Sequence, residues 1–265
     1  MKKAGIVFLL SIVFSCGKVP TPEPNQPFDH FTGDFETGNL TGFHFLVADA
    51  SINAVVISFP RRKGKFALKN TLRTDDYIND GYRSELAVYN CAKYKSEVFY
   101  SFSMMIDPAY SDQEYNLVCQ WQDLPNYLQG EDWNSTPALH GSPPPVSMVY
   151  AHEKLVLKMN ENPNSNNQTF TVGTAQSIKK GEWCDLVFHI YWSDDNSAYI
   201  EAWVNGNAFT PFNGTDHKYY KRNLFSRSGN YFKFGQYRGE NRPSETSIIY
   251  FDEVKIGSSY HEVEL

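Results

Sequence analysis

The chain has 265 residues, with 24 basic and 30 acidic side chains and a formal net charge of −6. This acidic balance argues against nucleic acid as a partner, because affinity for nucleic acid depends on clustered cations. It does not exclude an anionic substrate, since a binding site can be locally basic within an acidic protein. Aromatic residues make up 15% of the chain, and this composition favours β-strands.

The first residues have the features of an export signal. Lys2 and Lys3 precede an apolar run over Ala4–Phe14, which is too short to span a bilayer as a helix. The run leads into VFSCG, where Cys16 lies at the place of the lipidated cysteine of a bacterial lipobox; an ordinary signal peptide is the alternative. We therefore expect an exported protein, either secreted or anchored to the outer membrane, with an N-terminal lipid as its only membrane contact.

The rest of the chain divides into a short linker and one domain. After a signal peptide over residues 1–16, the Pro-rich residues 17–27 are typical of a tether. Residues 28–265 have a length that is usual for a single all-β domain. Cys91, Cys119 and Cys184 lie in apolar, strand-like contexts, which predicts buried free thiols.

Short alternating runs, separated by Gly, Asn, Pro and Asp, dominate this domain and predict an all-β fold. The expected strands are Ala54–Ser58, Lys65–Leu68, Arg83–Tyr89, Glu97–Ile106, Tyr115–Gln122, Val146–Tyr150, Lys154–Met159, Trp183–Trp192, Ala198–Val204, Tyr231–Tyr237 and Ser247–Ile256. Asn205-Gly206 is a strong hairpin signal. About a dozen strands without helical crossovers predict a two-sheet antiparallel β-sandwich of the jelly-roll type. The irregular stretches 123–145 and 209–230 are candidate walls of a binding groove.

The segment Tyr231–Gly239, YFKFGQYRG, alternates strictly. Phe232 and Phe234 point to one face, which is suited to a core. The opposite face carries a cation, a glycine and two phenols, at Tyr231, Lys233, Gly235 and Tyr237. Such a face suits the floor of a polar groove in which a ligand approaches the backbone at the glycine; an edge strand with a solvated outer face is the alternative.

Two other strands carry polar pairs on one face. Arg83 and Glu85 form either a structural ion pair or an arrangement in which Glu85 orients Arg83 toward a sugar carboxylate. Gln120 and Gln122 share a face opposite Leu117, Cys119 and Trp121, just before a long loop. They are either carbohydrate-binding amides or part of a solvated face.

These patterns, RSEL, QWQ and YFKFGQY in that order, resemble the jelly-roll, concanavalin A-like polysaccharide lyases. The chain is similar to the alginate lyases of that architecture and, more closely, to the bacterial heparin-lyase-like group, which its segments WCDLVFHI (183–190) and EAWVNG (201–206) also resemble. The likeness spans roughly residues 30–257. It implies a concave substrate groove and β-elimination of a uronic-acid-containing, anionic polysaccharide.

The resemblance also implies roles for the polar residues. Arg83 and Gln120 would neutralise the uronate carboxylate, so that negative charge can build up when the C5 proton is removed. Tyr237 would protonate the leaving oxygen and, in one route, also act as the base. The substrate-binding residues would be Lys233, Gln122, Glu85, Tyr231 and Arg238.

One position departs from the family pattern. Gln122 stands where these lyases carry a histidine base, and glutamine cannot act as a base. His140 on the adjacent loop is the first substitute, and His152 and His217 are weaker ones. The other route uses Tyr237 alone, with its pKa depressed by nearby cations.

If neither route operates, the chain is a non-catalytic, cell-surface glycan-binding lipoprotein. A glycoside hydrolase of the same shape ranks last, because the E-x-D-x-x-E strand signature is absent.

No cofactor is expected for catalysis, but a structural Ca²⁺ is. In carbohydrate-active sandwiches that this chain resembles, an acid of the first strand and an Asp of the last strand hold Ca²⁺, for which oxygen ligands are suitable. Glu36 and Asp252 are the candidates. The alternative is two solvent-facing acids in paired terminal strands.

Overall fold

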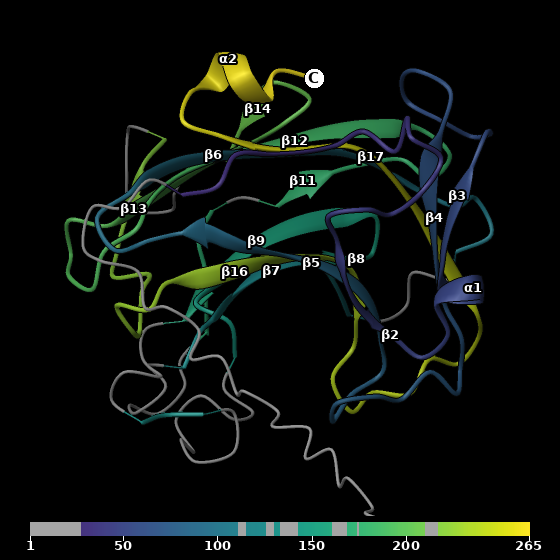
Figure 1. The fold of residues 1–265 in the computed structure, drawn as a ribbon, viewed down its shortest axis with the longest axis horizontal. Helices are drawn as coiled ribbons and strands as arrows, with labels where there is room; N and C mark the ends of the chain where they lie inside the picture. Colours follow the sequence, from purple (N-terminus) through teal and green to yellow (C-terminus); the bar gives the residue numbers. More distant parts are fainter. Residues whose placement is uncertain are drawn as a thin grey trace, which may run out of the picture.

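The computed structural model describes residues 28–110, 115–125, 130–132, 143–160, 169–173, 175–209 and 217–265. Cys16 and His140 lie outside the described residues. Within these ranges, two antiparallel sheets pack face to face, as Figure 1 shows. The described residues form no helix that is both long and apolar enough to cross a membrane.

The first sheet has nine strands within the described residues. Its main order is β14 (Asn207–Ala208), β13 (Tyr199–Val204), β12 (Trp183–Tyr191), β6 (Glu97–Ile106), β17 (Ser247–Gly257), β4 (Ala67–Leu72) and β3 (Ala54–Ile57). Strand β1 (Phe31–Gly33) pairs with β17, and β15 (Tyr219–Tyr220) pairs with β13. We refer to it as the nine-stranded sheet.

The second sheet has eight strands within the described residues and carries the residues of the three sequence patterns. Its main order is β10 (Thr169–Thr171), β9 (Lys154–Asn160), β8 (Val146–Ala151), β7 (Asn116–Asp123), β16 (Asn230–Tyr237), β5 (Arg83–Ala92) and β2 (His44–Val47), and β11 (Gln176–Ser177) pairs with β9. Because β16 lies between β5 and β7, the RSEL, QWQ and YFKFGQY patterns come together on adjacent strands.

The predicted all-β sandwich is confirmed, and two helices of one turn, α1 (Ala50–Asn53) and α2 (Tyr260–Val263), accompany the sheets. The hairpin turn is also confirmed, because Asn205 and Gly206 both have positive φ, 50° and 75°. One strand is displaced: β4 begins at Ala67 rather than Lys65. The N–H groups of Lys65 and Phe66 donate to the Glu36 carboxylate instead of to a strand.

Aromatic rings fill the space between the sheets. Trp121 and Phe232 from the eight-stranded sheet and Phe188 and Phe102 from the nine-stranded sheet are fully buried, with ring centroids of Trp121 and Phe188 5.0 Å apart. Burying each such side chain contributes on the order of 1.5–3 kcal/mol. Cys91, Cys119 and Cys184 are buried free thiols, as predicted.

An irregularity in β7 corrects one face assignment. The pairing of β7 with β8 shifts register between Leu117 and Cys119. Val118 and Cys119 therefore both belong to the main core cluster, whereas Leu117 is buried outside that cluster. A bulge of this kind changes which side chains face the core.

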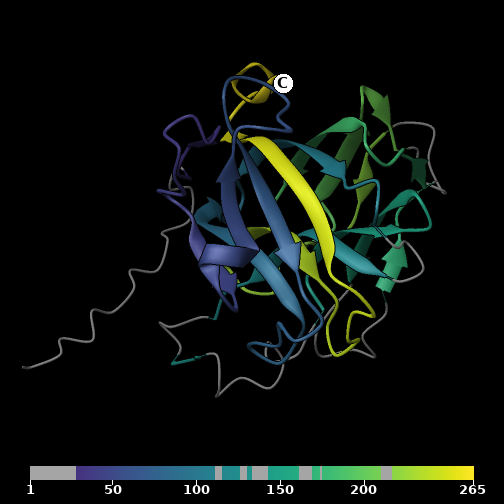
Figure 2. The same ribbon diagram turned by 90° about the vertical axis from the view of Figure 1, so that its right-hand side faces the viewer.

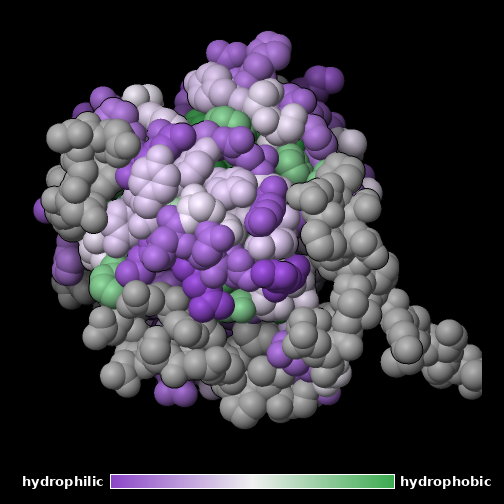
Figure 3. All heavy atoms as spheres, turned by 90° about the vertical axis from the view of Figure 1, so that its left-hand side faces the viewer, coloured by the Kyte–Doolittle hydropathy of each residue, from purple (hydrophilic) through white to green (hydrophobic). Residues whose placement is uncertain are grey.

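Figure 2 shows β3, β4 and β17 side by side in the nine-stranded sheet. In Figure 3 the left-hand side of the molecule has a mostly hydrophilic surface, on which apolar residues form small, separated patches.

Candidate active site

The centre of the candidate site is the carboxylate of Glu85 on β5, which is 1% exposed. Its neighbour Leu86 packs into the core, so the alternation of the strand turns Glu85 to the outer face of the eight-stranded sheet. Gln120 Nε2 donates to Glu85 Oε1 over 2.5 Å. Arg83 Nη1 and Lys233 Nζ lie 3.5 and 3.7 Å from Glu85 Oε2. We call Arg83, Glu85, Gln120, Lys233 and Tyr237 the Glu85 cluster.

The strand register explains why these groups meet. Lys233 on β16 is opposite Gln120 on β7 and Ala87 on β5, and Tyr237 is opposite Arg83. The small Ala87 leaves the long Lys233 side chain beside Glu85. Lys233 is 4% exposed, and burial lowers its pKa although Glu85 acts in the opposite direction. The alternative interpretation of YFKFGQYRG as a solvated edge strand is therefore wrong, because β16 lies between β7 and β5 and this face of it is largely enclosed.

Tyr237 is the partly exposed member of the cluster. The Arg83 guanidinium carbon lies 4.2 Å from the centre of its ring, a cation–π contact. Burial raises the pKa of Tyr237, which Arg83 opposes and Glu85 reinforces. The expected depression of this pKa is thus wrong, because loss of hydration outweighs the nearby cation. A raised pKa keeps the phenol protonated and suits it to donate a proton.

Two residues that the sequence analysis did not single out fix the position of Tyr237. Asn116 is fully buried, and its Oδ1 accepts the Tyr237 N–H over 3.0 Å while its Nδ2 donates to Tyr110 and Gln236. Gly81 packs against the phenol, where an added Cβ would lie 2.6 Å from Tyr237 Cε2. An Asn at the end of a strand and a Gly in a loop are common features, so the sequence offered no specific signal for either.

Gly235 has a different role from the one predicted. It has a φ of 133°, and an added Cβ would lie 2.2 Å from the Ser84 carbonyl oxygen. The group that approaches this glycine is therefore the backbone of β5. Its strand pairing with Glu85 brings β16 close to the carboxylate at the centre of the cluster.

Aromatic rings continue from the cluster across the outer face. Tyr231 stacks on Tyr89 with ring centroids 4.8 Å apart, and His44 meets Tyr89 edge-on at 4.7 Å. Lys233 Nζ lies 5.4 Å from the Tyr231 ring centre. Tyr89 and His44 were missed, although the i, i+2, i+6 spacing of Arg83, Glu85 and Tyr89 along β5 was a usable signal for Tyr89.

The remaining predicted residues have varied positions. Gln122 is partly exposed and pairs in register with Tyr231. Arg238 is buried beyond the end of β16, where burial lowers its pKa and the nearby Tyr110 opposes this shift. His152 lies in the turn between β8 and β9, and His217 precedes β15; both are exposed.

The two candidate calcium ligands bind the same loop, residues 58–66, through its backbone. Glu36 Oε1 accepts the N–H groups of Lys65 and Phe66, and these bonds lower its pKa. Asp252 Oδ2 accepts those of Arg62 and Lys63. The described residues contain no group of three or more His, Cys, Asp or Glu placed to hold a metal. The calcium site stays a prediction.

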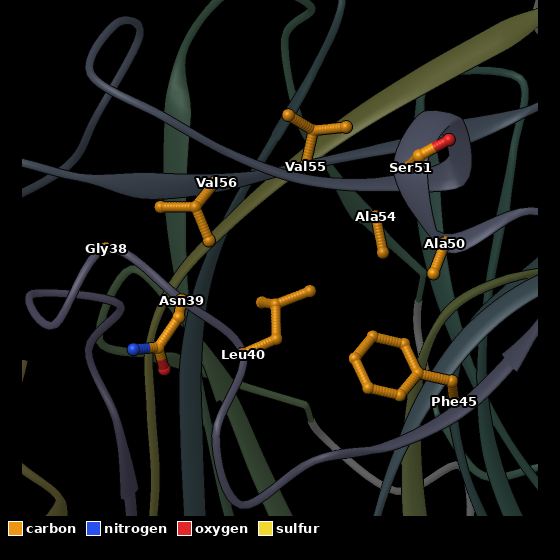
Figure 4. A pocket seen from close by; sticks show the side chains of 9 residues that line it. All are labelled: Gly38, Asn39, Leu40, Phe45, Ala50, Ser51, Ala54, Val55 and Val56. Carbon is orange, nitrogen blue, oxygen red and sulfur yellow. The ribbon is translucent and has the colours of Figure 1, made fainter.

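A separate pocket of about 360 Å³ lies beside the edge strands β2 and β3 (Figure 4). Leu40 and Phe45 point into it in that view, and its other lining residues are Gly38, Asn39, Ala50, Ser51, Ala54, Val55 and Val56. It has no charged lining residue, and it contains no member of the Glu85 cluster. A uronate carboxylate would find no counter-charge there.

Solved structures with a similar fold include several lyases. The endo-β-1,4-glucuronan lyase of the fungus Trichoderma reesei has a TM-score of 0.66 and 20% identity, with 88% of this chain and 97% of that chain covered. The alginate lyase A1-II', of polysaccharide lyase family 7, has a TM-score of 0.55 and 15% identity over 83% and 95%. The cellulose-induced protein Cip1 has a TM-score of 0.53 and 14% identity, with 86% of this chain and 97% of that chain covered. Among curated proteins, none matches the sequence.

These structural likenesses establish the jelly-roll fold, and the sequence itself establishes the family. The family model described as polysaccharide lyase matches residues 35–255, which is most of the chain and includes every strand of the Glu85 cluster. The chain therefore belongs to the polysaccharide lyase family.

Proposed function

We propose that this lyase cleaves a uronic-acid-containing polysaccharide by β-elimination at the Glu85 cluster. The observation that carries the proposal is the charge of the cluster: Arg83 and Lys233 surround one carboxylate, with the partly exposed Tyr237 against Arg83. With Lys233 protonated, the cluster has one excess positive charge in an otherwise acidic protein. That charge suits a carboxylate substrate.

The chemistry assigns a step to each group. The C5 proton of a uronate becomes removable when cations and hydrogen-bond donors stabilise the charge that builds up on the carboxylate. Arg83 is suited to this role, because its guanidinium is a permanent cation that lies against the partly exposed Tyr237. Gln120 carries a second amide hydrogen besides the one that it donates to Glu85. Loss of the C4 oxygen completes the double bond, and Tyr237 supplies the proton that this oxygen takes up.

The base is a separate proposal. A raised pKa leaves little tyrosinate near neutral pH, which favours Tyr237 as the acid and another group as the base. We propose His140 for this role, with Tyr237 acting alone as the second candidate. His140→Ala should abolish elimination if His140 is the base. Retention of most of the activity would transfer the role to Tyr237.

The location and the metal are also proposals. The Lys2–Cys16 segment favours export with a lipid on Cys16. Mass spectrometry of the mature N-terminus would distinguish a lipidated cysteine from an ordinary cleaved terminus. Glu36 and Asp252 remain the proposed structural Ca²⁺ ligands, and an unchanged melting temperature on adding Ca²⁺ to chelator-treated protein would contradict that role.

The reaction itself is tested by ultraviolet absorbance. β-Elimination conjugates a C4–C5 double bond to the carboxylate, which absorbs at about 235 nm, whereas hydrolysis and binding create no such chromophore. Purified protein is incubated with alginate, glucuronan and heparin-like polymers. A rise with one of them is the expected result. A flat trace with all of them, together with calorimetric binding to one, would instead support the non-catalytic glycan-binding function.

A further inference from the structure

The loop that connects β3 to β4, residues 58–66, presents a compact basic surface. Within it, Arg61, Arg62, Lys63 and Lys65 are all exposed, and no acidic residue interrupts them. Phe59 is 79% exposed, the largest exposure among the large hydrophobic side chains of the described residues. Figures 1 and 2 show this loop at the end of β3 and β4 opposite α1. We call residues 58–66 the basic loop.

The basic loop is held in one conformation by bonds to the protein below it. Asp252 and Glu36 each accept two of its backbone N–H groups. Arg62 forms a bidentate ion pair with Asp185, at 2.9 and 3.1 Å. Arg61 closes the loop on itself by donating to the carbonyl oxygens of Ser58 and Gly64.

These bonds separate the charges of the loop into two groups. The carboxylates of Asp185 and Asp252 neutralise Arg62 and cap backbone groups beneath the loop. Among the described residues, Arg61, Lys63 and Lys65 form no ion pair, and all three are exposed beside Phe59. Glu36 interacts electrostatically with Lys65 and Arg61, but its carboxylate accepts the backbone N–H groups of the loop. A rigid loop that exposes three cations and one aromatic ring loses little conformational entropy when it binds a ligand.

The basic loop does not belong to the candidate active site. Asp185 and Asp252, which anchor it, alternate with the core residues Cys184, Leu186 and Phe251, so they lie on the outer face of the nine-stranded sheet. The Glu85 cluster lies on the outer face of the other sheet. A ligand at the loop therefore binds on a different side of the sandwich.

We propose that the basic loop is a second binding site for an anionic polysaccharide, which holds the enzyme on its polymer while another part of the chain is cleaved. This inference rests on the proposed function for the identity of the polymer. Lys63, Lys65 and Arg61 contact its carboxylates, and the Phe59 ring packs on the apolar face of a sugar. A lipid surface fits less well, because Phe59 is the one large apolar side chain exposed there and interfacial binding scales with buried apolar area.

The test compares two double variants in a Tyr237→Phe background. K63Q/K65Q removes two outward charges and leaves the anchoring bonds of the loop, which use backbone N–H groups and the two arginines. K95Q/K179Q removes two exposed lysines elsewhere and is the matched control. Retention on immobilised alginate and glucuronan is measured at several salt concentrations, with phosphatidylglycerol vesicles as the lipid probe.

The expected result is a roughly three- to tenfold weaker retention of K63Q/K65Q at low salt, with a weaker salt dependence, while the control stays unchanged. Equal retention of the two variants would overturn the inference, as would absence of retention of the parent on both polymers. If K63Q/K65Q lost binding to the vesicles but kept its retention on both polymers, the inference would also be overturned, in favour of a lipid surface. If the wild-type enzyme cleaves a polymer while the two double variants are retained equally on it, this inference is refuted and the proposed function stands.

Discussion

Two clusters of charged and aromatic side chains face outward from opposite sheets, and their charge differs. In the Glu85 cluster, two cations surround one carboxylate that is 1% exposed. On the nine-stranded sheet, His189 lies between two carboxylates, 2.7 Å from both Glu97 Oε1 and Glu201 Oε2. We call this second group the His189 cluster.

The difference shows which cluster is suited to an anionic substrate. In the His189 cluster the carboxylates outnumber the imidazole, Tyr199 donates to Glu97, and His189 stacks on Phe99 at 4.0 Å. Lys218 Nζ lies 4.1 Å from the centre of the Tyr199 ring, but two carboxylates oppose this cation and the imidazole. The His189 cluster therefore has no excess positive charge to offer a uronate. The Glu85 cluster retains excess positive charge and a partly exposed phenol. A cluster of charged groups and tyrosines is thus not sufficient to predict a site for an anionic substrate. The sign of the excess charge distinguishes the two clusters.

The largest expected effect distinguishes the two clusters by activity. Tyr237→Phe should lower elimination by about 10²–10⁴-fold, because positioned proton transfer contributes that much. Tyr199→Phe, which removes the corresponding hydroxyl from the His189 cluster, should leave the rate within about twofold of wild type. Initial rates at about 235 nm measure both. Similar losses in the two variants would remove the functional distinction between the clusters.

The next effect is on stability. Glu85→Gln should lower the free energy of unfolding by about 3 kcal/mol, since it leaves Arg83 and Lys233 buried without their counter-charge. Glu97→Gln, at a carboxylate side chain that is 54% exposed, should cost less than about 1 kcal/mol. Denaturant unfolding of both variants provides the comparison. A loss for Glu85→Gln no larger than that for Glu97→Gln would mean that the buried carboxylate is not the centre of the ion-pair network.

A smaller effect concerns pH. Because the pKa of Tyr237 is raised above its ordinary value of 10.0 by burial, its proton is retained as the pH rises through neutrality. The fall in kcat caused by loss of this acid should therefore begin only above about pH 10. A pH–rate profile on a saturating polymer measures it. If an ionisation near pH 8 is assigned to Tyr237 by tyrosinate difference spectra, the environment described for the phenol is wrong.

The smallest effect is an absence of reaction. Burial raises the pKa values of Cys91 and Cys184 to about 12, and that of Cys119 also rises well above its usual range. These thiols should resist an aromatic disulfide reagent in the native protein and react after denaturation. Rapid modification of any of the three in native protein would show that the sheets open locally.

Much of this arrangement could be predicted from the sequence, because strand alternation is a local rule. Period-two patterning predicted that the side chains of Phe232, Phe234 and Leu86 point to the core face of their strands, and each belongs to the core. The same rule placed Arg83 with Glu85 on one face.

What could not be predicted depends on non-local packing. The register shift in β7 moved Val118 into the core, and no local pattern announces such a bulge. The pKa of Tyr237 was expected to fall because of its cationic neighbours, yet burial raises it, and burial depends on the whole fold. Asn116 and Gly81 both contact Tyr237 on β16, from which they are distant in the sequence.

The most direct test of the central claim is a crystal structure of Tyr237→Phe with a bound uronate tetrasaccharide. We expect a sugar carboxylate against Arg83 and Gln120, with the scissile C4 oxygen facing residue 237. An oligosaccharide that avoids the outer face of the eight-stranded sheet, or that contacts it without approaching Arg83, would contradict the assignment of the Glu85 cluster as the active site.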